Sequence, residues 1–454
     1  MKNILNNYRF KQFGDKYFIT TDHGSYCILS KIEFERLSKG KIDNKLCKKL
    51  EEKEIIINYN NFKEAVRLTA NRNFFLFYGT SLHIIVVTLR CNMNCVYCQA
   101  SSKSPSKKEF DMDKKTAKST VDFIFQTPNK SITIEFQGGE PLLNWNILKY
   151  TIEYAHKKNK KVKKDMKITI VTNLSLMNKD KMDFIIKNGV DVCTSLDGPK
   201  KLHDCNRKFI RGSNYEQVAI WIKKFNKEYK KRKINDKKIY ALVTLTKKSL
   251  EYPKEIIDEY VKLGFNQIHL RFLNKLGVAK KVWHEIKYSV EEYIAFWKNA
   301  VDYIEDLRKK GIDISERMVN TMFNKVNNEF DPDFLDLRSP CGAVIGQLAY
   351  NYNGDIYSCD EARMIGDDLF KLGNVKKDNY KNITTSNKAC AIINSSINDQ
   401  YICDNCVYKP YCGICPVCNY AEQGSVIGKI IQTDRCKKFK KQFDWVIREK
   451  FINK

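Results

Sequence analysis

The feature that most constrains the fold of this chain is a regular alternation between residues 82 and 273. Apolar runs of strand length alternate there with amphipathic stretches of helix length, a pattern typical of βαβ units in a parallel sheet. Because six strand candidates are present, we predict an α/β fold with a partial, TIM-like (β/α)6 barrel. In such barrels the chemistry lies at the carboxyl ends of the strands. The strand candidates are residues 83–89, 132–136, 168–172, 190–195, 239–244 and 267–271, and the helix candidates between them include 114–125 and 252–263.

The amino-terminal region has a different pattern. Three short alternating segments precede two helical stretches, an order that predicts a small winged-helix-like module. A DNA-binding winged helix is the alternative, but Glu51 and Glu52 place acidic charge in the second helix. The strand candidates are residues 8–13, 16–20 and 26–29, and the helix candidates are 31–38 and 44–53.

The carboxyl-terminal region is polar and rich in cysteine. After Pro340 the chain breaks into short polar segments, and bound metal would have to replace much of a core there. The predicted domains are residues 1–75 (winged-helix-like module), 76–280 (partial barrel), 281–335 (helical linker) and 336–454 (cysteine-rich domain).

The sixteen cysteines limit the class of protein. The longest apolar run, residues 82–89, is far shorter than a membrane span, and residues 1–7 lack the apolar block of a signal peptide. We therefore predict a cytoplasmic protein with no membrane partner. Because cytosolic thiols stay reduced and thiolates are ligands of iron and zinc, clustered cysteines indicate metal sites rather than disulfides.

The formal net charge of +27 permits three explanations: a nucleic acid partner, an acidic peptide partner, or no local function. Lys, Asn and Ile are abundant along the whole chain and Arg is scarce, as codon use in an AT-rich genome produces. The excess charge forms no basic stripe interleaved with aromatic residues, the pattern of single-stranded nucleic acid binders. We therefore do not expect a nucleic acid partner.

Three cysteines, Cys91, Cys95 and Cys98, directly follow the first predicted strand. Three thiolates leave one iron of a four-iron cluster open, and a catalytic cluster needs such a vacant position. Zinc is the alternative, but zinc sites usually take four ligands in paired CxxC units, and no second pair lies nearby. The CxxxCxxC spacing and the aromatic Tyr97 resemble the radical S-adenosylmethionine (SAM) superfamily. This resemblance implies that the open iron chelates the amino and carboxylate groups of SAM.

The same resemblance implies that a GGEP segment after the second strand supports the SAM amino group. Gly138 and Gly139 would let the backbone approach the ligand, and Glu140 would offer a counter-charge. A tight turn is the alternative, but its position one strand after the cysteine run favours the SAM site.

A hydroxyl and a guanidinium after the fourth strand suit the SAM carboxylate. They belong to Ser195 and Arg207, and Arg forms bidentate pairs with carboxylates. A helix cap at Asp197 and a surface salt bridge of Arg207 are the alternatives, and Arg211 is near enough to compete. Further SAM-pocket candidates at strand ends, for which simple barrel packing is the alternative, are Asn173, Thr244 and Leu273.

A second set of cysteines resembles the SPASM domain, which binds two auxiliary four-iron clusters in radical SAM enzymes that act mostly on peptides. Cys341 and Cys359 would hold one cluster. Where the usual pattern has a further ligand this chain has Pro416; Cys415 and Cys418 flank it, so either or both would ligate, and we favour both. Four-thiolate zinc sites are the alternative. The predicted total is therefore three [4Fe-4S] clusters. The ligands of the other auxiliary cluster would be Cys403, Cys406, Cys412 and Cys436.

Asp360 follows Cys359 directly. In related SPASM maturases of sulfatases an aspartate in this place accepts a substrate proton after hydrogen abstraction, and the resemblance implies the same catalytic role here. An ion pair with Arg363 is the alternative.

Longer runs resemble the His-Xaa-Ser system radical SAM maturases, which are encoded beside small peptides. The resemblance implies a radical SAM oxidoreductase in which reductive cleavage of SAM yields a 5′-deoxyadenosyl radical. That radical would abstract hydrogen from a ribosomally made precursor peptide to install a thioether or carbon–carbon crosslink. The amino-terminal module would bind the leader sequence of that peptide as an added strand. The runs are residues 82–91, 134–143, 194–199 and 360–364.

Three other functions stay open on the sequence. A formylglycine-type sulfatase maturase would not need the amino-terminal module. An RNA-modifying radical SAM protein is compatible with the charge. A purely electron-carrying cluster protein would need neither GGEP nor a SAM pocket. The predicted enzyme also needs an electron donor such as ferredoxin or flavodoxin.

Overall fold

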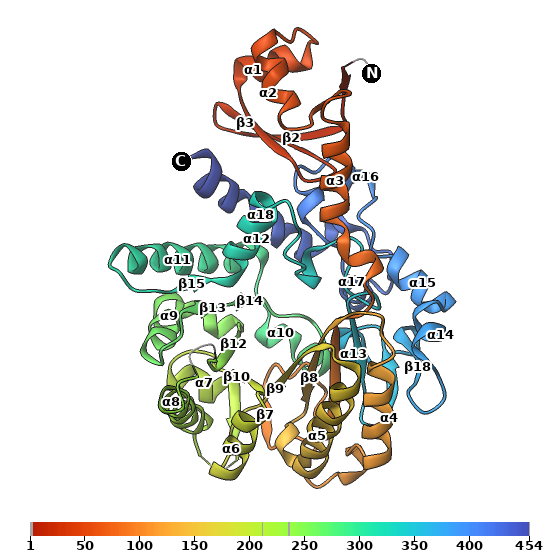
Figure 1. Cartoon of the computed structure of the whole chain (residues 1–454). Coiled ribbons are helices and arrows are strands. Elements are labelled where there is room, and N and C mark those ends of the chain that lie inside the picture. Colours follow the sequence, from red (N-terminus) through yellow and green to blue (C-terminus); the bar gives the residue numbers. More distant parts are fainter. Residues whose placement is uncertain (1–2, 211, 235–236, 454) are drawn as a thin grey trace.

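The computed structural model describes residues 3–210, 212–234 and 237–453, and its central element is a mostly parallel sheet (Figure 1). Neighbouring strands are parallel from β14 to β16 and antiparallel from β16 to β18. In order across the sheet, the strands are β14 (Leu270–Arg271), β12 (Tyr240–Thr244), β10 (Asp191–Ser195), β9 (Asp165–Val171), β8 (Ser131–Gly138), β6 (Leu82–Thr88), β16 (Gln347–Tyr350), β17 (Asp355–Tyr357) and β18 (Lys371–Asn374).

The six strands predicted from the sequence are all present, which confirms the α/β class. Their apolar runs are buried as expected for parallel strands covered on both faces; Ile84, Ile85 and Val86, for example, are at most 2% exposed. The last predicted strand is interrupted at His269. Its first half, β13 (Gln267–Ile268), pairs with β15 (Ser315–Glu316) outside the central sheet.

Helices connect these strands and lie along the outer side of the sheet (Figure 1). Each forms because an apolar stripe recurs every three or four residues; one of them, α5, buries Leu148, Ile152 and Ala155 on one face. The predicted helices 114–125 and 252–263 correspond to α4 and α9. The connecting helices are α4 (Lys114–Ile124), α5 (Trp145–Val162), α6 (Lys179–Lys187), α7 (Lys200–Asn206), α8 (Asn214–Lys231) and α9 (Pro253–Lys262).

The amino-terminal region forms a small module of strands followed by helices, as predicted. A capping box starts its first helix, because the Ser30 hydroxyl accepts from the Glu33 amide while the Glu33 carboxylate accepts from the Ser30 amide. The module and the helix after it comprise β1 (Ile4–Leu5), β2 (Tyr8–Phe13), β3 (Lys16–Thr21), β4 (Tyr26–Ser30), α1 (Lys31–Ser38), α2 (Asn44–Glu51), β5 (Ile56–Ile57) and α3 (Phe62–Arg72).

The carboxyl-terminal region extends the central sheet, which the sequence did not predict. All four residues of β16 are buried, and the strand pairs with β6. A four-residue strand is too short for its pattern to stand out among polar segments. The remaining elements are β7 (Met93–Cys95), β11 (Arg207–Phe209), α10 (Trp283–Ile286), α11 (Val290–Lys309), α12 (Arg317–Asn327), α13 (Asp360–Ile365), α14 (Tyr380–Thr384), α15 (Asn387–Asn394), α16 (Tyr401–Asp404), α17 (Pro416–Gln423) and α18 (Asp434–Ile447).

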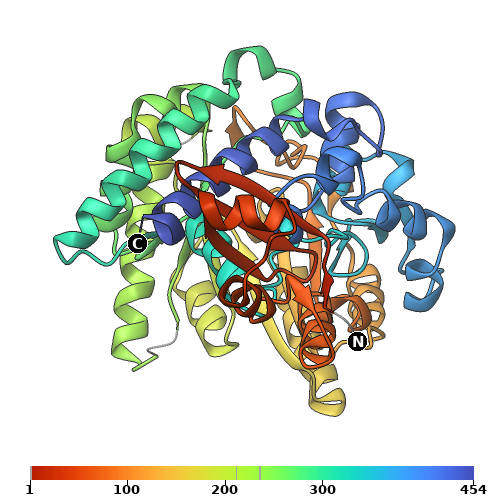
Figure 2. The same ribbon diagram turned by 90° about the horizontal axis from the view of Figure 1, so that it is seen from above.

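The amino-terminal module sits against the end of the chain, and Figure 2 shows it above α18. Lys11 on β2 pairs with Asp444 on α18 (2.5 Å). The Thr20 hydroxyl donates to the Val407 carbonyl (2.8 Å) between two cysteines of the carboxyl-terminal set. The module is therefore fixed to the cysteine-rich region.

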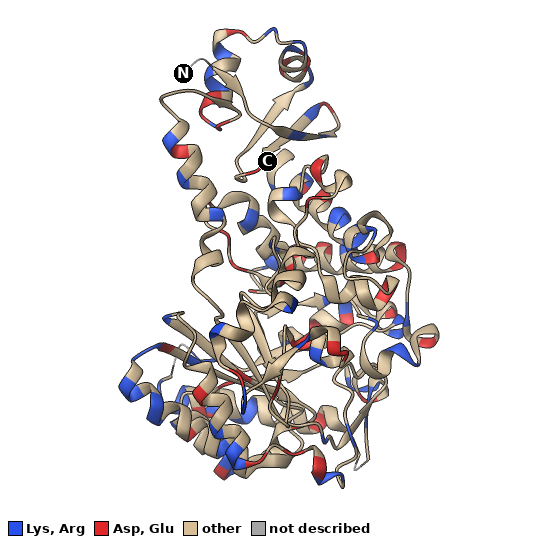
Figure 3. Cartoon of the chain, turned by 90° about the vertical axis from the view of Figure 1, so that its right-hand side faces the viewer, with Lys and Arg blue, Asp and Glu red and all other residues tan. Residues whose placement is uncertain are grey.

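Charged side chains are distributed over the whole molecule, with Lys and Arg interspersed with Asp and Glu in every part of the ribbon (Figure 3). Among the residues with a described position, no helix is both long enough and apolar enough to cross a membrane.

Candidate functional site

The cysteines of the CxxxCxxC run lie in the loop after β6. The Met93 amide donates to the Cys91 sulfur (3.4 Å). Burial raises the pKa of Cys91, as do the charges of Glu140 and of the thiols of Cys95 and Cys98. The loop therefore gathers three thiols, with an N–H group directed at one sulfur, as protein-bound iron–sulfur clusters require.

The donor set of this loop fits a catalytic cluster. Within residues 3–210, 212–234 and 237–453, no three His, Cys, Asp or Glu side chains converge on a position for a single metal ion. The three thiols suit a four-iron cluster instead, because three thiolates leave one of its irons open for a further ligand.

Arg207 lies beside this loop, since β7 pairs antiparallel with β11 and places Arg207 opposite Cys95. Its Nη1 donates to the Tyr97 hydroxyl (2.7 Å), which in turn donates to Asp197 (2.6 Å). Its Nε is buried and has no hydrogen-bond partner in the described part of the chain. A free, buried guanidinium N–H fits an anionic ligand such as the SAM carboxylate.

The glycines of GGEP allow the end of β8 to approach the chain that leads into Cys91. A Cβ on Gly139 would lie 2.0 Å from the Arg90 carbonyl oxygen, and one on Gly138, which has φ +123°, would lie 2.5 Å from the Thr88 carbonyl oxygen. A side chain at either position would push the two strand ends apart. In this structure the two glycines therefore let two segments of the chain approach each other, whereas the approach of the backbone to SAM stays a prediction.

Glu140 is 1% exposed, and its carboxylate is occupied by the chain. One oxygen accepts from the Leu142 amide (3.0 Å) and the Thr172 hydroxyl (2.7 Å), and the other accepts from the Asn173 amide (2.8 Å). Burial raises the pKa of Glu140. The Asn173 side chain donates to Asn92 in the cysteine loop (3.0 Å). Glu140 therefore positions Asn173; its role as a counter-charge to SAM stays a prediction.

The other predicted SAM residues have different surroundings. Ser195 ends β10 two residues after Cys193, which lines the central cavity, so both lie on one face of the strand. Leu273 is 4% exposed, and its amide donates to the Tyr288 hydroxyl (2.7 Å). Leu273 is not among the described residues that line the cavity. Arg211 lies outside the described residues.

Cys341 and Cys359, which we predict to hold an inner auxiliary cluster, lie close enough to Cys415 for its charge to act on both, and the Cys418 amide donates to the Cys415 sulfur. Burial raises the pKa of Cys341 to about 12, and the charge of Cys415 adds to the rise. Burial also raises the pKa of Cys359, as do the charges of Glu361, Cys415 and Cys341. Ligation of one cluster by all four cysteines stays a prediction. Amide groups donate to three of these sulfurs at 3.4 Å: Ala343 to Cys341, Ala362 to Cys359 and Cys418 to Cys415.

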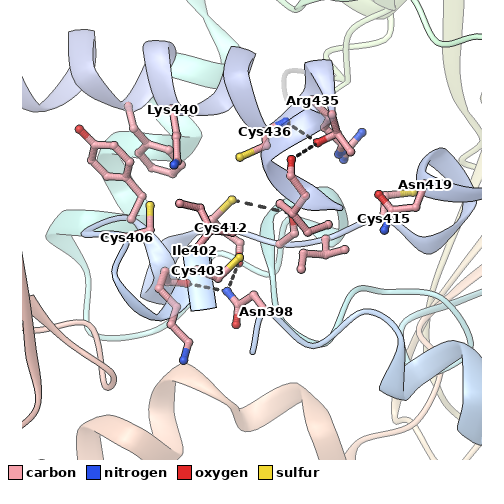
Figure 4. A pocket seen from close by; sticks show the side chains of 17 residues that line it. Asn398, Ile402, Cys403, Cys406, Cys412, Cys415, Asn419, Arg435, Cys436 and Lys440 are labelled. Carbon is pink, nitrogen blue, oxygen red and sulfur yellow. Dashed lines mark hydrogen bonds between the residues drawn. The ribbon is translucent and has the colours of Figure 1, made fainter. Parts of the chain in front are cut away.

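A small cavity has five cysteines in its wall: Cys415, and the four predicted to hold the other auxiliary cluster, whose sulfur atoms Figure 4 shows around one space. Burial raises the pKa of the Cys403 thiol to about 11, and the charges of Cys436 and Cys406 add to the rise. The four cysteines, spaced as predicted, are Cys403, Cys406, Cys412 and Cys436.

A cavity of about 1040 Å³ lies between the sheet and the carboxyl-terminal region. One of its lining residues is Gln99, which directly follows Cys98, so the cavity reaches the residue after the cysteine run. Asp360 also lines it, and its Oδ1 accepts from Arg363 Nε (2.8 Å). The ion pair considered as an alternative is thus present, and the proton-acceptor role of Asp360 stays a prediction.

Several charged residues of this cavity were not predicted from the sequence, among them Glu135, Arg271 and Arg317. The sequence pattern around Glu135 could have indicated that residue. Glu135 lies between the buried Ile134 and Phe136, so a polar residue marks the second face of an otherwise apolar strand.

Comparison with known families defines the class of this protein. Residues 85–260 match the radical SAM superfamily, and residues 341–419 match SPASM, an iron–sulfur cluster-binding domain. The first range contains the CxxxCxxC loop, and the second contains all but one of the carboxyl-terminal cysteines assigned above. The chain is a radical SAM enzyme with a SPASM domain, and these domains indicate that it binds iron–sulfur clusters and SAM.

Several known proteins are similar to this chain, including the following. The cysteine-type anaerobic sulfatase-maturating enzyme of Clostridium perfringens is 25% identical over 363 residues, which cover 76% of this chain and 91% of that protein. The solved structure of native anSMEcpe with bound AdoMet has a TM-score of 0.67 at 21% identity and covers 82% of this chain and 98% of its own. Streptococcus suis SuiB bound to its precursor peptide SuiA has a TM-score of 0.57 at 17% identity, covering 94% and 98%. The two structures show that the fold is shared.

Proposed function

We propose that this chain oxidises a side chain of a peptide substrate by radical SAM chemistry. The observation that carries the proposal is that three thiols gather in one loop and that an arginine stands opposite one of them, with a buried Nε that has no hydrogen-bond partner among the described residues. Cys91, Cys95 and Cys98 supply the thiols, and Arg207 supplies the N–H.

Each group beside the cavity has a separate role in this proposal. The three cysteines hold a four-iron cluster and leave one iron open for SAM. Cluster and SAM together, when bound, supply an organic radical that removes a hydrogen atom from the substrate. Arg207 orients the SAM carboxylate through its free Nε, and Ser195 offers a hydroxyl to the same group. Glu140 holds Asn173, which contacts the cysteine loop. The close packing at Gly138 and Gly139 keeps the end of β8 next to the same loop.

Two further groups of thiols support a total of three four-iron clusters. The inner group is Cys341, Cys359, Cys415 and Cys418, and the outer group is Cys403, Cys406, Cys412 and Cys436 (Figure 4). All sixteen cysteines are free thiols. We therefore infer a reducing, cytoplasmic setting. The reductive cleavage of SAM also requires an electron donor, for which we propose a ferredoxin or flavodoxin.

Asp360 is the proposed proton acceptor for the substrate radical. It lines the cavity and is 5% exposed, so that a proton could pass to it away from bulk water. Arg363 holds its carboxylate in place through the 2.8 Å contact.

The amino-terminal module is the proposed recognition element for a leader peptide, with a winged-helix-like fold beside a partial barrel. β2 is an edge strand of the sheet β2-β3-β4 and pairs only with β3 among the described residues. An extended leader could add to its free side. The likeness to SuiB covers 94% of this chain. The resemblance to His-Xaa-Ser system maturases also implies a precursor peptide as the substrate.

Two products are candidates. Likeness to the sulfatase-maturating enzyme over 76% of this chain favours oxidation of a Cys or Ser side chain to formylglycine. The amino-terminal module favours the second candidate, a thioether or carbon–carbon crosslink in a precursor peptide. An RNA substrate is not favoured, because Lys and Arg alternate with Asp and Glu along the ribbon in the view of Figure 3.

Mass spectrometry of candidate peptides tests the proposal. The enzyme is incubated anaerobically with SAM, a reductant and either a sulfatase-derived peptide with Cys or Ser or a peptide encoded beside the gene. An aldehyde that reacts with a hydrazide indicates formylglycine, and a loss of two hydrogen atoms without an aldehyde indicates a crosslink. Transfer of a methyl group, or modification of RNA alone, would contradict the proposal.

A further inference from the structure

Most charged side chains of the central cavity are paired within the chain. Arg271 pairs with Glu361 (3.1 Å), and Asp360 pairs with Arg363 (2.8 Å). Arg317 also lines the cavity, but it forms no ion pair with any residue of the described ranges. An arginine that faces a large cavity without a carboxylate partner has donor capacity for a ligand.

The fold fixes the position of Arg317. It is the first residue of α12 and directly follows β15, and its neighbour Glu316 is 2% exposed. The Glu316 carboxylate accepts from the Leu270 amide (3.1 Å) at the start of β14 and from the Val319 amide (2.7 Å). The Arg317 guanidinium lies over the Phe334 ring, 5.5 Å from its centroid. A ring contact engages the face of the guanidinium and leaves the N–H groups at its edge available.

Glu135 is a cavity carboxylate that also lacks an ion-pair partner in the described ranges. Its side-chain partner is the Gln137 amide (2.5 Å) on the same strand. Burial raises the pKa of Glu135, while the positive charge of Arg317 opposes the rise. Glu135 and Arg317 both line the cavity and carry opposite charges, so a carboxylate ligand there would be attracted by Arg317 and repelled by Glu135.

We propose that Arg317 binds a carboxylate of the peptide substrate inside the cavity. The inference rests on the proposed function, since it assumes that the cavity takes a peptide. A carboxylate matches the planar donor fork of arginine, whereas a neutral amide of the same shape offers one oxygen and two competing donors. The carboxylate belongs either to an Asp or Glu side chain or to the carboxyl terminus of the peptide.

The test is the affinity of three short probes for the anaerobically reconstituted enzyme with SAM but without reductant. The probes are acetyl-Ala-Asp-Ala-amide, acetyl-Ala-Asn-Ala-amide and acetyl-Ala-Asn-Ala with a free carboxyl terminus, measured by calorimetry or NMR titration. We expect the wild type to bind one of the two carboxylate probes roughly tenfold more tightly than the neutral probe, as charge-assisted hydrogen bonds permit. Preference for the Asp probe would assign the carboxylate to an acidic side chain, and preference for the probe with a free carboxyl terminus would assign it to the end of the peptide.

Variants assign the preference to Arg317. Arg317→Gln should remove it, and Arg317→Lys should retain part of it because the charge remains while the fork is lost. Glu135→Gln should increase it, since the repelling charge is removed. The control is Arg308→Gln, an exposed arginine on α11 that pairs with Glu305, and it should leave the preference unchanged.

Two results would overturn the inference: equal or undetectable binding of all three probes to the wild type, or a preference that survives in Arg317→Gln. No SAM is cleaved in this experiment, so failure here leaves the proposed function standing. Conversely, failure to modify any peptide would leave a measured preference at Arg317 intact.

Discussion

Arg207 stands directly opposite Cys95 in the antiparallel pair that β7 forms with β11. The pairing ties the segment after α7 to the cysteine loop after β6, two parts of the chain far apart in sequence. The Arg207 Nε is buried and has no hydrogen-bond partner within the described residues. The proposed cluster ligation by Cys95 and the proposed recognition of the SAM carboxylate by Arg207 therefore depend on the same two paired strands.

Replacement of Arg207 should weaken SAM binding. We expect Arg207→Gln to raise the Kd of SAM by roughly 10–100-fold, the usual range for a lost charge-assisted hydrogen bond, and Arg207→Lys to have a smaller effect. Calorimetry on the unreduced enzyme measures this. Lys208→Gln, at the exposed next position of β11, is the matched control. Unchanged SAM affinity in Arg207→Gln would remove Arg207 from the site.

Both Cys415 and Cys418 should be needed for the inner auxiliary cluster. Cys415→Ser and Cys418→Ser should each lower the iron content by about four atoms per chain, because a cluster that loses a thiolate is not retained. Iron analysis and Mössbauer spectroscopy measure the loss. Cys390→Ser, an exposed cysteine outside the spacing pattern, should keep full iron content. Full iron content in either of the first two variants would show that the affected cysteine is not a ligand.

Asp360→Asn should separate substrate modification from SAM cleavage. We expect product formation to fall by roughly 10²–10⁴-fold, the usual contribution of a positioned proton acceptor, while SAM is still cleaved. Chromatography of peptide and nucleoside products from the same reaction gives both rates. Arg363→Gln removes the ion pair but keeps the carboxylate, so it should retain more product formation than Asp360→Asn. Equal losses in both variants would indicate that only the ion pair matters.

Glu316 should make the stability of the protein depend on pH. Burial raises the pKa of Glu316 from 4.5 to about 7. Because the folded state then binds a proton that the unfolded state releases, this stabilisation is fully present below about pH 4.5 and is lost as the pH rises through about 7. Across that window the wild type should lose about 3 kcal/mol relative to Glu316→Gln.

Thermal unfolding at a series of pH values measures this effect of Glu316. The Tm of the wild type should fall relative to that of Glu316→Gln as the pH rises. Glu153→Gln, at an exposed position on α5, should show no such trend. A Tm difference between wild type and Glu316→Gln that is independent of pH would contradict the prediction.

The main sheet and the cysteine sites were predictable because their signals are local. A run such as residues 82–88 is apolar over a whole strand, and cysteine spacing is visible without the fold. The pairing of β16 with β6 and the cavity position of Arg317 were not predictable, since they depend on strands of four and two residues that join distant segments. The occupied carboxylate of Glu140 also depends on a neighbouring strand, through Thr172 and Asn173.

The central claim is that three thiols after β6 hold a cluster with one iron open for SAM. The most direct test is to purify the protein without oxygen, reduce it with dithionite in the presence of SAM, and quantify 5′-deoxyadenosine. We expect an iron-containing protein that forms 5′-deoxyadenosine, and we expect Cys95→Ala to lose this product. Protein that contains zinc in place of iron, or that leaves SAM intact under strong reduction, would contradict it.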